Sequence, residues 1–384
     1  MINEFGFMLP TRIHFGLSTS EKIGTEIREM GLQNILVVTD GLFSKVPVFE
    51  KMLHHLSKEG ITFRIFNKLK GEPDTEIVAE GAAFLRAGDT DGILGIGGGS
   101  SMDLAKALSV LGTNPGTVDD YMGVNLVRTP PLPLMVVPTT AGSGSEVTRV
   151  AVLTNRKERL KAGIVSMLIT PKSVILDPVF LTTLPPKVVA ETGVDALSHA
   201  IEAFYSLGAN PISDILAKDA IKRIHSNLRA LVANPQNLSA AGSMLLGSTL
   251  AGAAFLNTGV GNVHSLAHEL GSYHHISHAL SVAVLLPYVM EHNLDACMER
   301  FAGMAEAMGV KIEGLTTREA AWKAVEEVKC LLSDVGIPEK LSALGVSDTH
   351  FKEMASAATK SPTYLSNPRK STVEELMGLY QKAL

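Results

Sequence analysis

Residues 91–110, DGILGIGGGSSMDLAKALSV, decide the fold of the first half of the chain. The apolar run ILGI predicts a buried strand, and MDLAKAL predicts a helix. Between them stand Gly97, Gly98, Gly99 and Ser100. Glycines let the backbone approach a ligand closely, and the start of the next helix offers free N–H groups and a positive dipole. The stretch therefore predicts a pyrophosphate site, or else a tight turn that needs glycine for its shape alone.

Strands and helices alternate on both sides of this unit. Apolar runs predict further strands at 35–40, 61–66, 133–140 and 150–154, with helices at 46–59 and 75–88. Such alternation is typical of a parallel sheet covered by helices.

Strand patterns nearly vanish after Pro185–Pro186. Helices are expected at 187–206, 211–231, 239–256, 262–272, 279–307 and 317–335. The fold class is therefore an α/β N-terminal dinucleotide-binding domain with a parallel sheet, followed by an all-α C-terminal metal-binding domain. The expected domains are residues 1–186 and 187–384.

Polar side chains follow two more of the expected strands. The turn after 133–140 carries Thr139, Thr140 and Ser143, whose hydroxyl groups suit phosphate or ribose oxygens. Asp40 ends the strand 35–40. Ligands of α/β sheets bind at the carboxyl ends of strands, where a carboxylate accepts a hydrogen bond from the ribose 2′-OH and repels a 2′-phosphate. Asp40 thus indicates NAD rather than NADP, unless it is an ordinary turn residue.

Acidic and histidine residues recur at helical spacing in the second half. Asp195 and His199 are four apart, as are His264 and His268, and His278 follows. Residues i and i+4 share one helix face, and a carboxylate with imidazoles suits Fe²⁺ or Zn²⁺. Such pairs can also be ordinary core or surface residues. Five of the twelve histidines fall within 264–278, a stretch otherwise rich in Ala, Leu and Val, which favours a metal site.

The bulk composition narrows the function classes. Net charge is −5 and no basic run is present, which disfavours a nucleic-acid partner. Two cysteines are too few for a disulfide framework, so a reducing cytoplasm is expected. The N-terminus lacks the pattern of a secretion signal. Residues 242–261 are uncharged but rich in glycine and lead into His264, so a buried helix is expected there rather than a membrane span.

Several long motifs resemble the iron-containing (group III) alcohol dehydrogenase family. They are GIGGGSSMDLAK, VPTTAGSGSEVT, ILDPVFLTTLPP, GVDALSHAIEAF and GNVHSLAHELG, and the resemblance runs nearly end to end. It implies a metal bound by Asp195, His199, His264 and His278.

The resemblance also suggests roles beyond the metal ligands. It places His268 beside the metal and substrate as a residue that is not a ligand, and a role in proton relay is expected for it. Thr148, Val152 and Lys161 match positions that line the nicotinamide. The family usually has Pro-His-Gly at its last ligand, where this chain has Ser277-His278-Ala279. The local backbone there is therefore in question.

The expected function is hydride transfer between NAD(H) and a small alcohol or aldehyde, with Fe²⁺ as the metal and Zn²⁺ as the alternative. A homodimer or higher homo-oligomer is expected, with no nucleic-acid or membrane partner. One alternative is a polyol dehydrogenase or a dehydroquinate-synthase-like lyase that uses NAD and Zn²⁺. The lyase would need several Lys and Arg residues near the metal, and none adjoins the histidines. A non-catalytic sensor of metal or nucleotide is the other alternative.

Overall fold

The computed structural model describes residues 4–155 and 160–384, which form two compact units. The first, called here the sheet unit, comprises Leu9–Thr140 and Gly144–Thr183. The second, called here the helical unit, comprises Leu184–Leu384, the short segment Ala141–Ser143 and the described part of Met1–Met8.

A six-stranded parallel sheet forms the centre of the sheet unit. Its strand order is β1-β9-β6-β4-β2-β3. Its strands are β1 (Arg12–Phe15), β2 (Asn34–Asp40), β3 (Thr62–Leu69), β4 (Gly92–Gly97), β6 (Leu134–Pro138) and β9 (Ser173–Leu176). Every neighbouring pair is parallel, which confirms the predicted sheet. β4 lies between β2 and β6, so the carboxyl ends of these three strands are neighbours.

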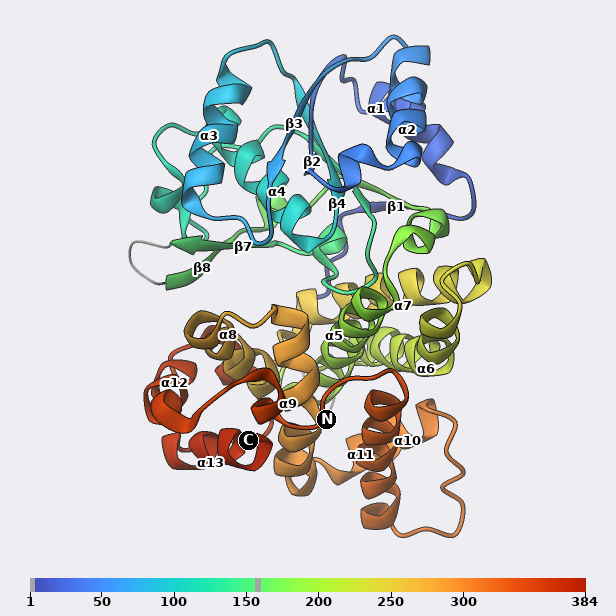
Figure 1. Ribbon diagram of the computed structural model, residues 1–384, viewed down its shortest axis with the longest axis vertical. Helices are drawn as coiled ribbons and strands as arrows, with labels where there is room; N and C mark the ends of the chain where they lie inside the picture. Colours follow the sequence, from blue (N-terminus) through green and yellow to red (C-terminus); the bar gives the residue numbers. More distant parts are fainter. Residues whose placement is uncertain (1–3, 156–159) are drawn as a thin grey trace. The chain divides into compact units, whose positions relative to one another are not determined.

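Helices cover both faces of this sheet. Figure 1 shows α1 (Ile23–Glu29) and α2 (Pro47–Lys58) on one side, with α3 (Thr75–Arg86) and α4 (Gly99–Thr113) on the other. Side chains of α1 and α2 form one core cluster with residues of β2, β4, β6 and β9. Burial of both faces explains why these strands are continuous apolar runs rather than alternating ones.

The strand predicted at 150–154 exists but does not join the parallel sheet. It is β7 (Val150–Asn155), which pairs antiparallel with β8 (Leu160–Val165) in a separate sheet. The third strand of that sheet is the two-residue β5 (Gly123–Val124). Only residues 156–159 separate β7 from β8 along the chain, which is too few for the crossover that a parallel pairing needs.

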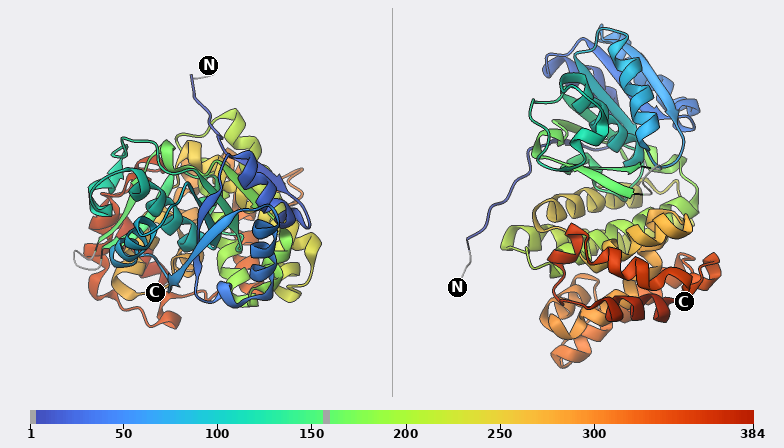
Figure 2. Two further views of the ribbon diagram at one scale, coloured as in Figure 1. Left: turned by 90° about the horizontal axis from the view of Figure 1, so that it is seen from above. Right: turned by 90° about the vertical axis from the view of Figure 1, so that its left-hand side faces the viewer.

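Helices alone make up the regular structure of the helical unit, in the part of it that is described (Figure 2). They are α5 (Pro186–Tyr205), α6 (Pro211–Ala233), α7 (Leu238–Thr258), α8 (Asn262–His274), α9 (His278–Asn293), α10 (Met298–Ala307), α11 (Thr317–Asp334), α12 (Phe351–Ala358) and α13 (Val373–Ala383). The prediction of a single helix over 279–307 is wrong. It divides into α9 and α10, because Cys297 leaves the helical backbone at φ −152° and ψ 47°.

Among the residues that the structure describes, one helix has the length and composition of a membrane span. α7 has a mean hydropathy of 1.4 over its most apolar window, but 67% of that window is buried within the protein. Its side chains pack against α5 and α6. The expectation of a buried helix before His264 is therefore confirmed.

Candidate active site

The Gly-rich turn lies where the carboxyl ends of β2, β4 and β6 meet. Gly97 has φ +144°, and a Cβ there would lie 2.4 Å from Oγ of Ser101, so only glycine fits. Its carbonyl accepts a hydrogen bond from the N–H of Thr139 at 3.0 Å. Gly98 is the N-cap of α4 and offers no capping side chain, which leaves the first turn of that helix suited to an anion.

Asp40 lies beside this turn. Its Oδ1 accepts hydrogen bonds from the N–H groups of Leu42 and Phe43, both at 2.8 Å. Its Oδ2 lies 3.5 Å from where a Cβ on Gly97 would stand. One carboxylate oxygen therefore shapes the turn after β2, while the other faces the Gly-rich turn. Oγ1 of Thr140 lies 3.4 Å from a Cβ position on Gly98, so this hydroxyl also borders the turn.

The helix of the Gly-rich motif holds the second loop through residues that the sequence analysis missed. Oδ2 of Asp103 accepts a hydrogen bond from the N–H of Val152 at 2.9 Å. Nζ of Lys106 donates to Oγ of Ser145 at 2.8 Å and lies 3.4 Å from Oγ1 of Thr148. The predicted cofactor positions Thr148 and Val152 are thus fixed by α4. The sequence feature that could have indicated this contact is a lysine, Lys106, in the middle of an otherwise apolar helix.

Lys106 is fully buried. Burial lowers the pKa of its ammonium group to about 8, against the opposing effect of Asp103 and Glu146. A buried lysine with a depressed pKa that donates to several oxygen atoms is typical of a structural or functional site rather than of a solvated helix face.

Two further predicted cofactor residues lie in other segments of the chain. Ser143 belongs to the segment Ala141–Ser143, which is part of the helical unit. Lys161 lies in β8, where it pairs with Thr154, but its side chain falls outside the described residues.

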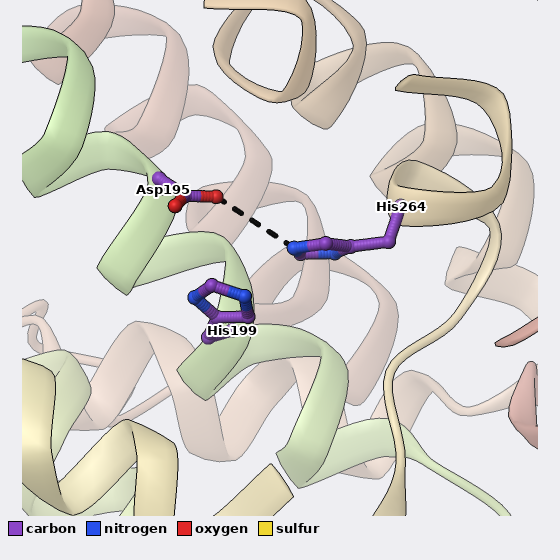
Figure 3. A group of neighbouring side chains, drawn as sticks. All are labelled: Asp195, His199 and His264. Carbon is purple, nitrogen blue, oxygen red and sulfur yellow. Dashed lines mark ion pairs between the residues drawn. The ribbon is translucent and has the colours of Figure 1, made fainter. Parts of the chain in front are cut away.

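Three of the predicted metal ligands converge within the helical unit. Asp195 and His199 come from one face of α5, and His264 comes from the first turn of α8 (Figure 3). All three are buried, and one ligand atom from each lies within 4.8 Å of the others. Nε2 of His264 is 3.6 Å from Oδ1 of Asp195, beyond hydrogen-bond distance. Across the described residues neither atom has a hydrogen-bond partner.

His199 is held by a backbone group on the other side of its ring. Its Nδ1 lies 3.2 Å from the carbonyl oxygen of Gly142, which can only accept, so Nδ1 carries the proton. Nε2 then keeps its lone pair for a metal. The ring stacks between Phe255 and His264, with centroid distances of 4.5 and 4.4 Å.

The three buried groups influence one another's pKa. Burial alone would raise the pKa of Asp195, but His199, His264 and His278 outweigh it and hold that pKa well below its usual range. Burial lowers the pKa of His199 to about 4. Burial opposes the proton on His264 too, but Glu202 and Asp195 raise its pKa to about 9. A metal ion must displace that proton, so metal binding and proton release are linked.

His278 lies at the edge of this cluster. Its Nε2 is 3.8 Å from Oδ1 of Asp195, and its side chain is 27% exposed. Ser277 is the N-cap of α9, accepts from the N–H of Leu280 at 3.4 Å and donates to Glu191 at 3.2 Å. The Ser-His-Ala sequence thus begins a helix without the family's proline, since a serine N-cap does the same task.

His268 is near the cluster but does not join the ligand group. Its ring stacks on His278 with centroids 5.2 Å apart, and it lies 6.3 Å from the ring of His264. His268 is half-buried and lies one turn after His264, and its role beside the metal site stays a prediction.

The donor set fits a divalent metal. Unpaired Oδ1 and Nε2 atoms inside a protein are costly, and a metal ion satisfies both at once. One carboxylate and three imidazoles suit Fe²⁺ or Zn²⁺ and leave a coordination position for substrate.

Comparison with known proteins shows the family of this chain. Residues 10–178 match the family model described as "Iron-containing alcohol dehydrogenase". Residues 189–384 match the model described as "Fe-containing alcohol dehydrogenase family, C-terminal". The chain belongs to the iron-containing alcohol dehydrogenase family. The expected resemblance and fold class are therefore confirmed.

Relatives in the iron-containing alcohol dehydrogenase family cover the whole chain. A 1,3-propanediol dehydrogenase of Klebsiella pneumoniae is 40% identical over 99% of this chain and 98% of that protein. An NAD-dependent methanol dehydrogenase of Bacillus methanolicus is 35% identical over 98% of this chain and 99% of its own length. A crystal structure of 1,3-propanediol oxidoreductase, 39% identical, has a TM-score of 0.97 and covers 100% of both chains. The chain is thus an oxidoreductase of the NAD- and metal-dependent alcohol dehydrogenase class.

Proposed function

We propose that this protein interconverts small primary alcohols or diols with their aldehydes, using NAD(H) and Fe²⁺ held by Asp195, His199, His264 and His278. Zn²⁺ suits the same ligands. The observation that carries the proposal is the convergence of Asp195 Oδ1 and His264 Nε2, two buried atoms 3.6 Å apart from different helices. Relatives named for 1,3-propanediol, methanol and lactaldehyde support small substrates.

The metal, when bound, supplies Lewis-acid chemistry that lowers the pKa of an alcohol. The residues of the chain prepare for this in three ways. The carbonyl oxygen of Gly142 and the carboxylate of Glu202 each accept a hydrogen bond from Nδ1 of a histidine, so that in the neutral rings Nε2 carries the lone pair. Phe255 packs on His199 and limits access of water to that side. His268 holds an imidazole beside His278, where we assign it to proton relay.

NAD(H) is proposed to bind at the Gly-rich turn of the sheet unit. The pyrophosphate would take the N-terminus of α4 after Gly97, Gly98, Gly99 and Ser100, with Thr139 and Thr140 bordering it. Asp40 would accept from the ribose 2′-OH through Oδ2, the oxygen that faces Gly97. Proposed contacts on the nicotinamide side are Thr148, Val152 and Lys161, with Ser143 contacting phosphate or ribose.

A cytoplasmic homo-oligomer is proposed. β1 is an edge strand of the sheet, and Ile13 and Phe15 within it and Leu17 after it expose 37%, 44% and 59% of their surfaces. An edge with unpaired backbone groups and apolar side chains is suited to pairing with a second copy.

Both cysteines, Cys297 and Cys330, are free, as expected in a reducing compartment. Light scattering should give the mass of a dimer or larger assembly, and Phe15→Lys should shift it toward monomer.

The main experiment measures NADH formation or consumption with a panel of small alcohols, diols and aldehydes. Protein purified anaerobically is assayed after loading with Fe²⁺ or Zn²⁺ and without metal. Turnover with small primary alcohols that requires metal and NAD(H) is the expected result. Binding of NAD and metal without turnover of any substrate in the panel would instead favour a sensor.

A further inference from the structure

A carboxylate that the sequence analysis did not single out lies directly behind the proposed metal ligands. Glu202 follows His199 by three residues on α5 and is fully buried. A buried carboxylate is costly unless several donors reach it. Oε1 accepts from the N–H of Val263 at 2.8 Å and from the hydroxyl of Tyr205 at 3.4 Å, while Oε2 accepts from Nδ1 of His264.

The hydrogen bond to His264 decides which ring nitrogen can bind a metal. A neutral imidazole has one N–H donor and one acceptor nitrogen. Because Nδ1 of His264 donates its hydrogen to Glu202, the neutral ring keeps its lone pair on Nε2, which is the atom 3.6 Å from Oδ1 of Asp195. Glu202 therefore sets both the tautomer of His264 and the direction of its ring.

The same carboxylate completes the start of the helix that carries His264. The N-cap of α8 is Gly261, which has no side chain to accept from the first N–H groups. Glu202 accepts from Val263 in its place, and a negative charge is favourable at a helix N-terminus. A Cβ on Gly261 would lie 3.0 Å from Oε1 of Glu202, so glycine leaves room for this contact.

A second side chain caps the same helix without touching His264. Oδ1 of Asn367 accepts from the N–H of Asn262 at 3.2 Å, and Asn367 exchanges two 2.9 Å hydrogen bonds with Asn293. Asn367 supports the start of α8 but does not orient the ring of His264. A substitution of Asn367 therefore tests the support of α8 separately from the orientation of His264.

We propose that Glu202 is a positioning residue that determines metal affinity and retention by holding His264 in its metal-binding tautomer and orientation. This inference rests on the metal site of the proposed function. A glutamine at 202 cannot accept from both Val263 and His264, because it presents one oxygen and one NH₂ group. Either its NH₂ group faces Val263 and opposes the helix start, or it faces His264 and drives the proton onto Nε2.

The test is Zn²⁺ affinity, measured by competition with a fluorescent chelator, and the visible spectrum with Co²⁺. It uses full-length wild type, Glu202→Gln, Glu202→Asp, Asn367→Ala and His264→Ala. We expect Glu202→Gln to weaken Zn²⁺ binding by about 10- to 100-fold and to alter the Co²⁺ spectrum. Glu202→Asp keeps the charge on a side chain that is shorter by one methylene group, and this variant should bind Zn²⁺ with intermediate affinity. Asn367→Ala should lower the thermal midpoint yet keep Zn²⁺ affinity within about twofold of wild type.

The outcomes separate this inference from the proposed function. If wild type and His264→Ala bind Zn²⁺ equally, the metal site itself is wrong. If His264→Ala loses Zn²⁺ while Glu202→Gln binds as wild type, only the role of Glu202 is overturned. Should Glu202→Gln fail to fold, Glu202→Asp decides, since wild-type affinity and spectrum in that variant overturn the role as well.

Discussion

Nζ of Lys106 lies 2.8 Å from the carbonyl oxygen of Val150, so a buried ammonium group on α4 holds the start of β7. This contact links the helix of the Gly-rich motif to the loop proposed to line the nicotinamide. It also buries a positive charge that lies 3.9 Å from Oδ1 of Asp103.

Stability should therefore depend on pH through Lys106. Burial lowers its pKa to about 8 in the folded chain from the ordinary value of 10.5, so between these pH values the unfolded chain binds more protons. The free energy of unfolding must then rise with pH across this window, by at most on the order of 3 kcal/mol. Below about pH 8 both states are protonated and the contribution is constant.

Urea unfolding of wild type and Lys106→Met at about pH 7.5 and about pH 9.5 checks this expectation. Methionine keeps the length of the side chain without the charge, so other titrating groups cancel in the comparison. Wild type should gain stability relative to the variant at the higher pH. A difference that does not change with pH would contradict the depressed pKa.

Loss of a metal ligand should abolish metal binding while the fold remains. His264→Ala removes one of the three buried donors and leaves an incomplete site. We expect bound metal and turnover to be lost, with an unchanged circular dichroism spectrum. His275→Asn is the matched control, because His275 is an exposed residue at φ 56°, where asparagine is tolerated. Full metal content in His264→Ala would exclude His264 as a ligand.

Cofactor preference should follow Asp40. Wild type is expected to favour NAD(H) over NADP(H), because the carboxylate accepts from a ribose 2′-OH and repels a 2′-phosphate. In Asp40→Gly, the ratio of kcat/KM with NAD(H) to kcat/KM with NADP(H) should fall about tenfold or more. Asp40→Asn separates charge from shape, since its side-chain oxygen can still accept from Leu42 and Phe43. A wild-type preference for NADPH would disprove this role of Asp40.

His268 should affect turnover rather than metal content. Its ring stacks on His278 and lies beside the ligand cluster. We expect His268→Ala to retain metal and to lower kcat by about 10²-fold or more, with loss of one limb of the pH profile, as for a proton relay. An unshifted profile with a raised KM would instead indicate contact with substrate. Metal loss as complete as in His264→Ala would make His268 a ligand.

The local parts of this fold and site follow from local patterns. The strand, Gly-rich turn and helix at residues 91–110 were predicted because apolar period and glycine position act over neighbouring residues. Asp195 and His199 were predicted to share a face because four residues make about one helical turn. The antiparallel pairing of β7 with β8 was not predicted, because the sequence of a short apolar strand does not indicate which strand it pairs with.

What the sequence by itself determined is the set of donor types, their helical spacing and the Gly-rich phosphate turn, since each depends on dihedral preferences and periodicity within one segment. The tertiary structure alone decided which groups complete them. Glu202 meets His264 across 62 residues, and Lys106 meets Val150 across 44. Such partners are chosen by the packing of whole helices and strands, where a buried charge is tolerated only when distant backbone and side-chain groups come together around it.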